Sequence, residues 1–232
     1  MNMGPRKDEC TDCKLKFVCF DSLNTDELAL INENKVQIRF KKGEIVSKQG
    51  TFVTHVMYIK SGYAKIYKET DIDNSLILDV IPSGRLIGLS SLFNKDNISR
   101  FSVAALDETT VCSIERSAIE KLIHQNSLFS ENIITLLNKS FLQFFDKMAS
   151  LTQKQMNGRV ADALLYLSED IFDSNQFKMI LSRKDLANFT GMSMMSVVRT
   201  LKEFKLAEVI ENKNGFMNIK DKAALKEISE KG

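Results

Sequence analysis

The sequence predicts an α+β protein, in which a β-rich N-terminal half is followed by a helical C-terminal half. Between Val36 and Ile114, short apolar alternations are separated by glycines at intervals of roughly ten residues, which is typical of an antiparallel sandwich or barrel. From Arg116 onward, apolar residues recur at helical spacing. The chain of 232 residues is long enough for one large domain or two small ones.

The β-rich part follows a leader, residues 1–20, and a short helix predicted at residues 24–34. Asn24 or Thr25 can cap this helix, because acidic residues stand in its first turn. Strands are expected at residues 36–40, 44–46, 56–59, 64–67 and 76–81. A helix at residues 117–126 is expected to close this part of the chain.

Residues around 132–152 carry the most regular apolar spacing in the chain. The steps alternate between three and four residues, which is the pattern of a heptad seam. A helix that packs only on its own domain would explain an apolar face, but the strict spacing, widened by Phe145, favours a dimer. The predicted interface residues are Ile134, Leu137, Phe141, Phe144, Met148 and Leu151.

Two helices are expected within residues 182–205, on either side of Gly191. Ser182 can cap the first helix, with Asp185 three residues on, and Ser193 can cap the second. Gly191 permits the positive φ of a tight turn between them. The pattern predicts a helix-turn-helix that binds DNA, and a purely structural helical hairpin is the alternative.

The second of these helices is predicted to enter the DNA major groove. It would expose Met194, Met195, Ser196, Val198 and Arg199 to the bases. Arg199 is long enough for bidentate pairing with guanine, and a phosphate contact or a solvated charge is the alternative for it. Arg183, Lys202 and Lys205 are interpreted as phosphate neutralisers.

Two further elements flank the helix pair. A helix is predicted within residues 152–174, and a hairpin is predicted at residues 207–219, with Asn214-Gly215 in its turn. A hairpin after a helix-turn-helix gives the winged form of the motif. The boundary between the β-rich part and the DNA-binding part is expected in helical sequence near Leu151.

Four cysteines are present, and Cys10, Cys13 and Cys19 fall within ten residues of one another. The N-terminus has no apolar core of a signal peptide, and we find no apolar run of about 18 residues that could span a membrane. A cytoplasmic protein that does not enter membranes is therefore expected. In that reducing compartment, clustered cysteines favour a metal site or a redox function over disulfides.

Composition excludes some functions and leaves others open. The net charge of +2 is too small to indicate a nucleic-acid partner by itself. The sequence contains no nucleophile–histidine–acid arrangement, no phosphate-binding glycine loop and no recognisable pair of catalytic carboxylates, so an enzyme is not expected. His55 and His124, the two histidines, leave little room for a histidine-rich metal site.

Taken together, these features resemble the CRP/FNR superfamily of bacterial transcription regulators over nearly the whole chain. The glycines in Lys42-Gly43-Glu44, Gln49-Gly50, Ser61-Gly62, Gly84 and Ile87-Gly88 resemble those of its cyclic-nucleotide-binding-type β-roll. Residues 181–201 resemble its DNA-reading motif. The resemblance implies that Ser182, Arg183, Ser193 and Ser196 contact phosphates and that Arg199 reads a guanine, and it implies RNA polymerase as a partner.

Within that superfamily, the spacing Cys10-x2-Cys13-x5-Cys19 resembles the oxygen-responsive FNR branch. The resemblance implies that Cys112 supplies the fourth thiolate to a [4Fe–4S] cluster. Four thiolates would also bind zinc, and a redox thiol switch is a further alternative. Cys112 on an apolar strand could instead be an ordinary core residue.

Three departures from the family pattern change what we expect. Leu89 and Ser102-Val103 stand where nucleotide-binding members have an acidic residue and an Arg-Ser pair, so cyclic AMP is not expected to bind. Met195 and Val198 replace polar residues of the recognition helix, which predicts a different DNA site with apolar contacts to thymine methyls. Phe144 replaces an acidic residue of the dimer helix, which predicts a dimer that is stable without a cluster.

The sequence thus predicts four segments: a leader at 1–20, a β-roll sensor at 21–130, a dimerisation helix at 131–151 and a winged helix-turn-helix at 152–232. The predicted function is a homodimeric transcription regulator that binds a pseudo-palindromic duplex and senses oxygen or nitric oxide. One alternative keeps the DNA binding but places haem or a small molecule in the β-roll, with His55, His124 or Met57 as possible haem ligands. Another is a ligand-regulated signalling module that does not bind DNA.

Overall fold

A computed structural model describes residue 10 and residues 18–70, 75–92, 94 and 96–232 of the chain. The α+β fold class predicted from the sequence is confirmed. The elements of the N-terminal part are η1 (Val18–Ser22), α1 (Thr25–Glu33), β1 (Lys35–Phe40), β2 (Ile45–Ser47), β3 (His55–Ser61), β4 (Tyr63–Glu69), β5 (Ser75–Pro82), β6 (Leu86–Ile87), η2 (Leu89–Ser91), β7 (Ser102–Ala105), β8 (Thr109–Glu115) and α2 (Arg116–Gln125).

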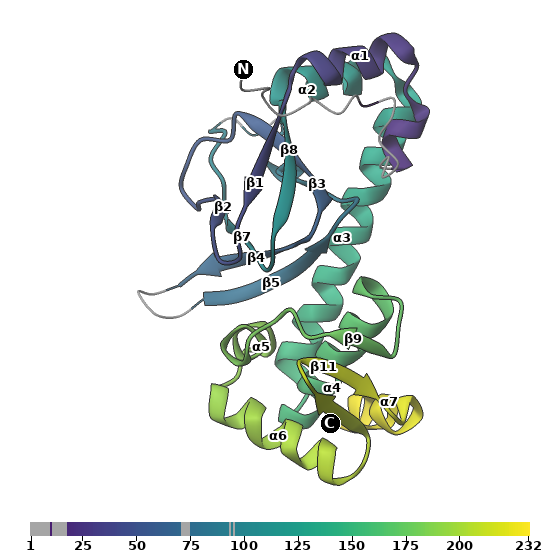
Figure 1. The fold of residues 1–232 in the computed structure, drawn as a ribbon. Helices are drawn as coiled ribbons and strands as arrows, with labels where there is room; N and C mark the ends of the chain where they lie inside the picture. Colours follow the sequence, from purple (N-terminus) through teal and green to yellow (C-terminus); the bar gives the residue numbers. More distant parts are fainter. Residues whose placement is uncertain (1–9, 11–17, 71–74, 93, 95) are drawn as a thin grey trace, which may run out of the picture. The chain divides into compact units, whose positions relative to one another are not determined.

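The C-terminal part is mainly helical, as the apolar spacing predicts (Figure 1). Its elements are α3 (Ser127–Gln153), α4 (Met156–Tyr166), a π-helical turn η3 (Leu167–Ile171), β9 (Gln176–Lys178), α5 (Arg183–Thr190), α6 (Met194–Leu206), β10 (Ile210–Lys213), β11 (Phe216–Ile219) and α7 (Lys222–Lys231). Within the described residues, no helix is both long and apolar enough to cross a membrane.

The chain divides into two compact units that differ in their bounds from the predicted segments. The first comprises Met1–Ala64 and Ile81–Phe141, and the second comprises Lys65–Val80 and Leu142–Gly232. Helix α3 therefore contributes to both units. Most of the β4–β5 hairpin groups with the helical part and not with the rest of the β-rich part.

The antiparallel sheets are built from strands that are distant in sequence. One sheet has the order β1-β8-β3-β6, and a second has the order β2-β7-β4-β5. In the first sheet, Cys112 of β8 lies opposite Gln37 of β1 and Tyr58 of β3. Strands β1 and β3 therefore both pair with β8, and this pairing between segments distant in sequence stabilises the short strands.

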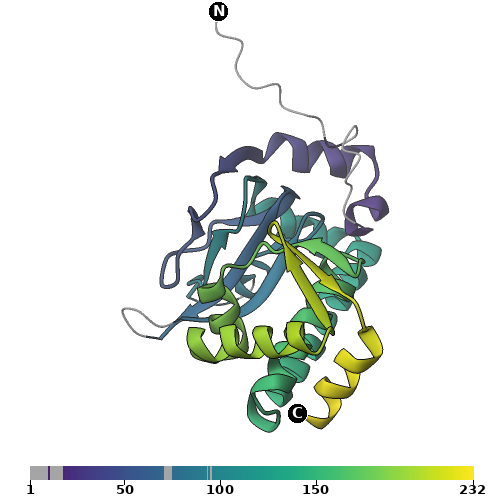
Figure 2. The same ribbon diagram turned by 60° about the horizontal axis from the view of Figure 1, so that its bottom comes forward.

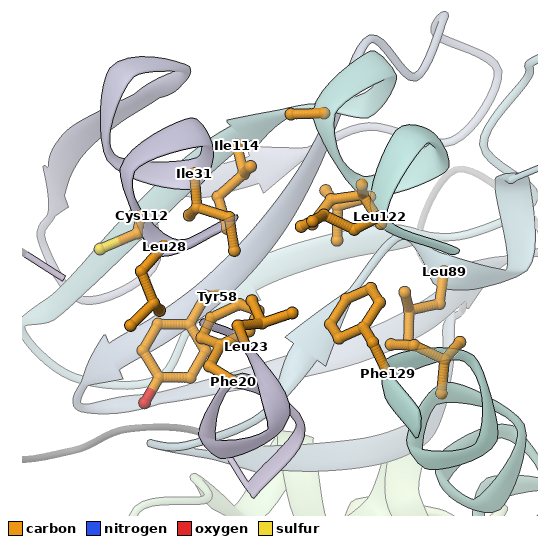
Figure 3. Close-up of a cluster of buried hydrophobic side chains, with 14 of the residues drawn as sticks. Phe20, Leu23, Leu28, Ile31, Tyr58, Leu89, Cys112, Ile114, Leu122 and Phe129 are labelled. Carbon is orange, nitrogen blue, oxygen red and sulfur yellow. The ribbon is translucent and has the colours of Figure 1, made fainter. Parts of the chain in front are cut away.

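The core of the first unit fills the space between this sheet and the helices α1, α2 and α3. Figure 3 shows the buried side chains, among them Phe20, Ile31, Tyr58 and Phe129. Phe20 stacks on Phe129 with ring centroids 6.3 Å apart and lies 5.8 Å from Tyr58. Asn24 caps α1 by accepting from the backbone of Glu27, as its sequence predicts.

The second unit combines α4, the α5–α6 pair and a three-stranded sheet of order β10-β11-β9. The predicted hairpin is present, and Asn214 and Gly215 both adopt positive φ in its turn. Strand β9 and helix α7 are additions that the sequence analysis did not predict. Figure 2 shows the β10–β11 hairpin and α7 of this unit in yellow.

Candidate nucleic-acid interface

Helix α5 is the first helix of the motif, and its two ends are formed as predicted. The Ser182 hydroxyl accepts from the Asp185 backbone at 3.0 Å, and the Asp185 carboxylate accepts from the Ser182 backbone at 3.1 Å. Gly191 ends the helix with φ of 62°, the left-handed conformation that glycine tolerates best. Leu186 and Ala187 are buried on one side of α5, which packs against α6.

Helix α6 is the second helix, and the Ser193 hydroxyl caps it by accepting from the Ser196 backbone at 3.1 Å. Val197, Leu201 and Phe204 are buried and fix one face of α6 against its own unit. The opposite face is exposed, and Met195 has 82% of its surface accessible. Met194 and Val198 are exposed beside Met195. Several exposed apolar side chains on one helix indicate a binding surface.

The structure brings the predicted DNA contacts onto the two helix N-termini and the exposed side of α6. Ser182 and Arg183 begin α5, Ser193 caps α6, and Ser196 follows in its first turn. The exposed residues of the predicted set are Ser182, Arg183, Ser193, Met194, Met195, Val198, Arg199 and Lys202, and Ser196 is half-buried.

The Arg199 guanidinium is accessible and weakly held. Its Nη2 lies 3.9 Å from the Met156 sulfur, and its Nε lies 3.9 Å from a Glu203 carboxylate oxygen. An exposed pair at this distance contributes little to stability, so the guanidinium can leave Glu203 for a stronger acceptor. This arrangement suits bidentate binding of guanine or phosphate.

An open groove beside α6 adds residues that the sequence analysis missed. Arg159 of α4 and Lys231 of α7 line it together with Ser193, Ser196 and Arg199. These two cations lie far from the helix-turn-helix in the sequence, and no local motif marks them. Only the packing of α4 and α7 brings them to the groove.

Two of the four predicted metal-ligating thiols can be described. Cys112 is buried in the core cluster of Figure 3, and half-buried Cys10 packs against the same cluster. The Lys35 ammonium donates to the Cys10 sulfur at 3.0 Å. Cys13 and the side chain of Cys19 lie outside the described residues. Among the residues that are described, no three metal-ligating side chains form a group.

Helix α3 exposes the apolar seam that the heptad spacing predicts. Of the predicted dimer residues, Ile134, Leu137, Phe141, Phe144 and Met148 are exposed, and Leu151 is half-buried. Leu142 and Phe145 are exposed beside them, and the rings of Phe144 and Phe145 lie 6.4 Å apart. The seam belongs to a helix of 27 residues and forms a long apolar surface.

The resemblance to nucleotide-binding family members places their phosphate-binding positions at Leu89, Ser102 and Val103, which are all buried here. Leu89 is buried in η2, and Val103 is buried in β7. Ser102 has no accessible surface, and its hydroxyl accepts from the Gln49 backbone at 2.9 Å. These side chains offer no charged group for a cyclic phosphate.

Comparisons with known proteins agree with this architecture. Residues 37–126 match the cyclic nucleotide-binding domain, and residues 158–228 match the Crp-like helix-turn-helix domain. The transcriptional activator protein Anr of Pseudomonas protegens is 27% identical over 91% of this chain and 88% of its own length. The fumarate and nitrate reduction regulatory protein of Yersinia pestis is 25% identical over 95% of this chain and 90% of its own length.

Solved structures show the same fold. FixK2 from Bradyrhizobium japonicum superposes with a TM-score of 0.77 at 17% identity, over 84% of this chain and 96% of that one. A CRP/FNR family regulator from Thermus thermophilus gives a TM-score of 0.64 at 19% identity, over 84% and 98% of the two chains. The chain belongs to the CRP/FNR family of transcription regulators, and its helix-turn-helix is the part that binds DNA.

Proposed function

We propose that this chain is a homodimeric, cytoplasmic regulator of the FNR-like branch, which senses oxygen or nitric oxide through a [4Fe–4S] cluster. The single observation that carries the proposal is the similarity to Anr and to fumarate and nitrate reduction regulators along nine-tenths of the chain. Another similar protein is named an anaerobic regulatory protein. Cys10, Cys13, Cys19 and Cys112 would supply the four thiolates.

The described surroundings of two of these thiols support such a site. Cys10 and Cys112 both pack in the hydrophobic core, which excludes water. Exclusion of water favours retention of an iron–sulfur cluster held by thiolates. Lys35 adds an ammonium donor at the Cys10 sulfur, and a charge-assisted hydrogen bond of this kind stabilises a thiolate ligand. A bound cluster would supply iron and sulfide that react with oxygen.

The side chains of the helix-turn-helix have roles in DNA binding that follow from their position and exposure. Arg199 reads a guanine, and Met194, Met195 and Val198 contact thymine methyls in the major groove. Ser182, Arg183, Ser193, Ser196 and Lys202 bind phosphates. Dimerisation along the α3 seam would place two recognition helices about one turn of DNA apart, on a pseudo-palindromic site. RNA polymerase would be the partner of the DNA-bound dimer.

We expect no binding of cyclic AMP, because Leu89, Ser102 and Val103, which the family resemblance places at the phosphate site, carry no charge. Isothermal titration with cyclic AMP should show no binding heat.

The deciding experiment is anaerobic purification followed by reconstitution with ferrous iron and sulfide. We expect about four irons and four sulfides per chain and a visible absorption band that is lost in air. Replacing Cys13 by alanine should abolish the band. Replacing Cys112 by valine, which preserves an apolar side chain on β8, should also abolish it.

Three results would overturn the sensing proposal. A colourless protein without iron would exclude the cluster, and one zinc per chain would establish the tetrahedral zinc alternative. A Cys112→Val variant that keeps its full iron content would remove Cys112 from the ligand set. The assignment of DNA binding to the helix-turn-helix does not depend on the cluster.

A further inference from the structure

Helix α5 is held from outside the helix-turn-helix by a hairpin of the β-rich sequence. Residues Lys65–Val80 form part of the same compact unit as α5, although they belong to the strands β4 and β5. Asp185 and Asn188 of α5 are three residues apart and therefore lie on one face of the helix. Leu186 and Ala187, which lie between these two residues in the sequence, are buried.

The N-terminal end of α5 is bound by Lys65 of β4. The Lys65 ammonium lies 2.5 Å from a carboxylate oxygen of Asp185, and both side chains are about four-fifths buried, with 21% and 15% of their surfaces accessible. The other Asp185 oxygen accepts from the Ser182 backbone and hydroxyl. One carboxylate therefore caps α5 and anchors it to the hairpin.

The Asp185 carboxylate is ionised at neutral pH. Burial raises the pKa of Asp185, but hydrogen bonds from Lys65 and Ser182 outweigh that effect and leave the pKa below its ordinary value. A largely buried ion pair with a second donor on the same carboxylate is more stable than an exposed surface pair.

A second hydrogen bond lies one turn further along α5. The Asn188 amide donates to the Ser75 hydroxyl of β5 at 2.9 Å. A third contact joins the same hairpin to α4, where the Tyr166 hydroxyl donates to Asp79 at 2.5 Å. The Tyr166 ring in turn stacks on Phe189 of α5 with centroids 5.6 Å apart.

The far end of α5 is held by a lysine of α3. The Lys147 ammonium lies 3.0 Å from the centroid of the Phe189 ring and donates to the Phe189 carbonyl. A cation at the C-terminal end of a helix interacts favourably with the helix dipole. The two ends of the first helix of the motif are thus bound by lysines from β4 and α3.

We propose that Lys65 is a positioning residue for DNA binding, which fixes α5 to the β4–β5 hairpin so that the recognition helix is presented at a set angle. The ammonium acts through Asp185 and does not touch DNA. Strand β4 begins at Tyr63 in the first unit and continues from Lys65 in the second, so the hairpin is covalently continuous with the first unit. This positioning role concerns the helix-turn-helix and does not depend on the proposed cluster.

Salt dependence of DNA binding separates a positioning lysine from one that binds phosphate. Each phosphate contact adds about 0.9 to the slope of log affinity against log salt, so a lysine that contacts phosphate in both halves of a dimer adds about 1.8. We expect Lys65→Met to weaken binding to a selected operator roughly five- to twenty-fold with an unchanged slope. Lys65→Arg should restore most of the affinity, because it keeps a cation at Asp185.

The second readout is amide hydrogen exchange of the full chain without DNA. Lys65→Met should speed exchange in α5 and leave α2 unchanged. Lys48→Met is the matched control, because it removes an exposed lysine from a turn of the first unit. Asn188→Ala is an independent variant that removes the Ser75 contact and should act in the same direction with a smaller effect.

Two outcomes would overturn the proposal. A salt slope lowered by about 1.8 in Lys65→Met would make Lys65 a phosphate ligand. Unchanged affinity together with unchanged exchange in α5 would show that the hairpin contact does not position the helix. If Lys65→Met fails to fold, the same two measurements on Asn188→Ala decide the question.

Discussion

Helices α3 and α6 both expose apolar side chains, but the two faces differ in what surrounds those side chains. The α3 seam consists of large aliphatic and aromatic residues, and Phe141, Phe144 and Phe145 make it continuous. The α6 face alternates Met195 and Val198 with Ser196, Arg199 and Lys202. An uninterrupted apolar face is complementary to another apolar face, whereas a mixed apolar and cationic face is complementary to a DNA groove.

The difference teaches that exposure of apolar residues does not by itself define a partner. Seven large hydrophobic residues of α3 between Ile134 and Met148 are accessible, too many for a helix in contact with water alone. On α6, flexible methionines can adjust to the positions of thymine methyls. Arg199 can add directional hydrogen bonds to a guanine. The following predictions test this comparison, beginning with the largest expected effect.

A charge in the α3 seam should abolish dimerisation. Phe144→Asp removes an aromatic ring from the seam and places two like charges opposite each other across the proposed two-fold axis. We expect the dimer dissociation constant to rise at least a hundred-fold, measured by analytical ultracentrifugation. Thr135→Asp is the control, because it adds the same charge to α3 outside the seam. A dimer that survives Phe144→Asp would show that the α3 face has another partner.

Loss of Arg199 should reduce both affinity and sequence preference. A bidentate contact to guanine contributes about 1–3 kcal/mol of discrimination, and the dimer loses one such contact in each half-site, so Arg199→Ala should weaken binding to the selected operator roughly 30-fold or more. Preference at one base pair of each half-site should disappear in a random-oligonucleotide selection. Lys202→Ala is the comparison, because loss of a phosphate contact weakens all sequences alike and lowers the salt slope. Equal loss on all sequences in Arg199→Ala would instead make it a phosphate ligand.

The apolar part of the α6 face should have a smaller and more specific effect. Met195→Ala removes the most exposed methionine of the helix, and we expect a few-fold loss on operators that carry thymine at its position. Replacing that thymine by uracil, which lacks the methyl group, should weaken wild-type binding by a similar factor and leave the variant unaffected. Equal sensitivity of both proteins to uracil would exclude Met195 as the methyl contact.

The features of these regions that depend on a few neighbouring residues can be predicted from the sequence. The Ser182–Asp185 capping box, the positive φ of Gly191 and the Asn214-Gly215 turn are local, and all are found as predicted. Strand β9 was missed because it has three residues, and it is stable only through its pairing with β11 and the stacking of Phe177 on Phe172.

The contacts around α5 are beyond sequence analysis for the same physical reason. Lys65 and Asp185 are separated by 120 residues, and Lys147 and Phe189 by 42. Neither lysine stands in a motif, and each resembles an ordinary surface lysine in the sequence. Only the packed fold shows that these two cations bind opposite ends of one helix.

The side of α3 that faces α5 provides the last test, which concerns stability and not DNA binding, through Lys147. Burial lowers the pKa of Lys147 to about 7, and the carboxylates of Asp79 and Asp162 oppose a larger decrease. The unfolded chain, with an ordinary lysine pKa near 10.4, binds more protons between pH 7 and pH 10 than the folded chain does. Stability therefore rises with pH in this window, by at most about 1.4 kcal/mol per pH unit.

Lys147→Met should remove this dependence, because methionine fills similar space without a charge. The free energy of unfolding of the wild type relative to the variant should increase from pH 7 to pH 10 and be level below pH 7, measured by urea denaturation at each pH. Lys139→Met, an exposed position on the same helix, should follow the wild type at every pH. Parallel curves for the wild type and Lys147→Met would show that burial does not lower the pKa of Lys147 in the folded chain.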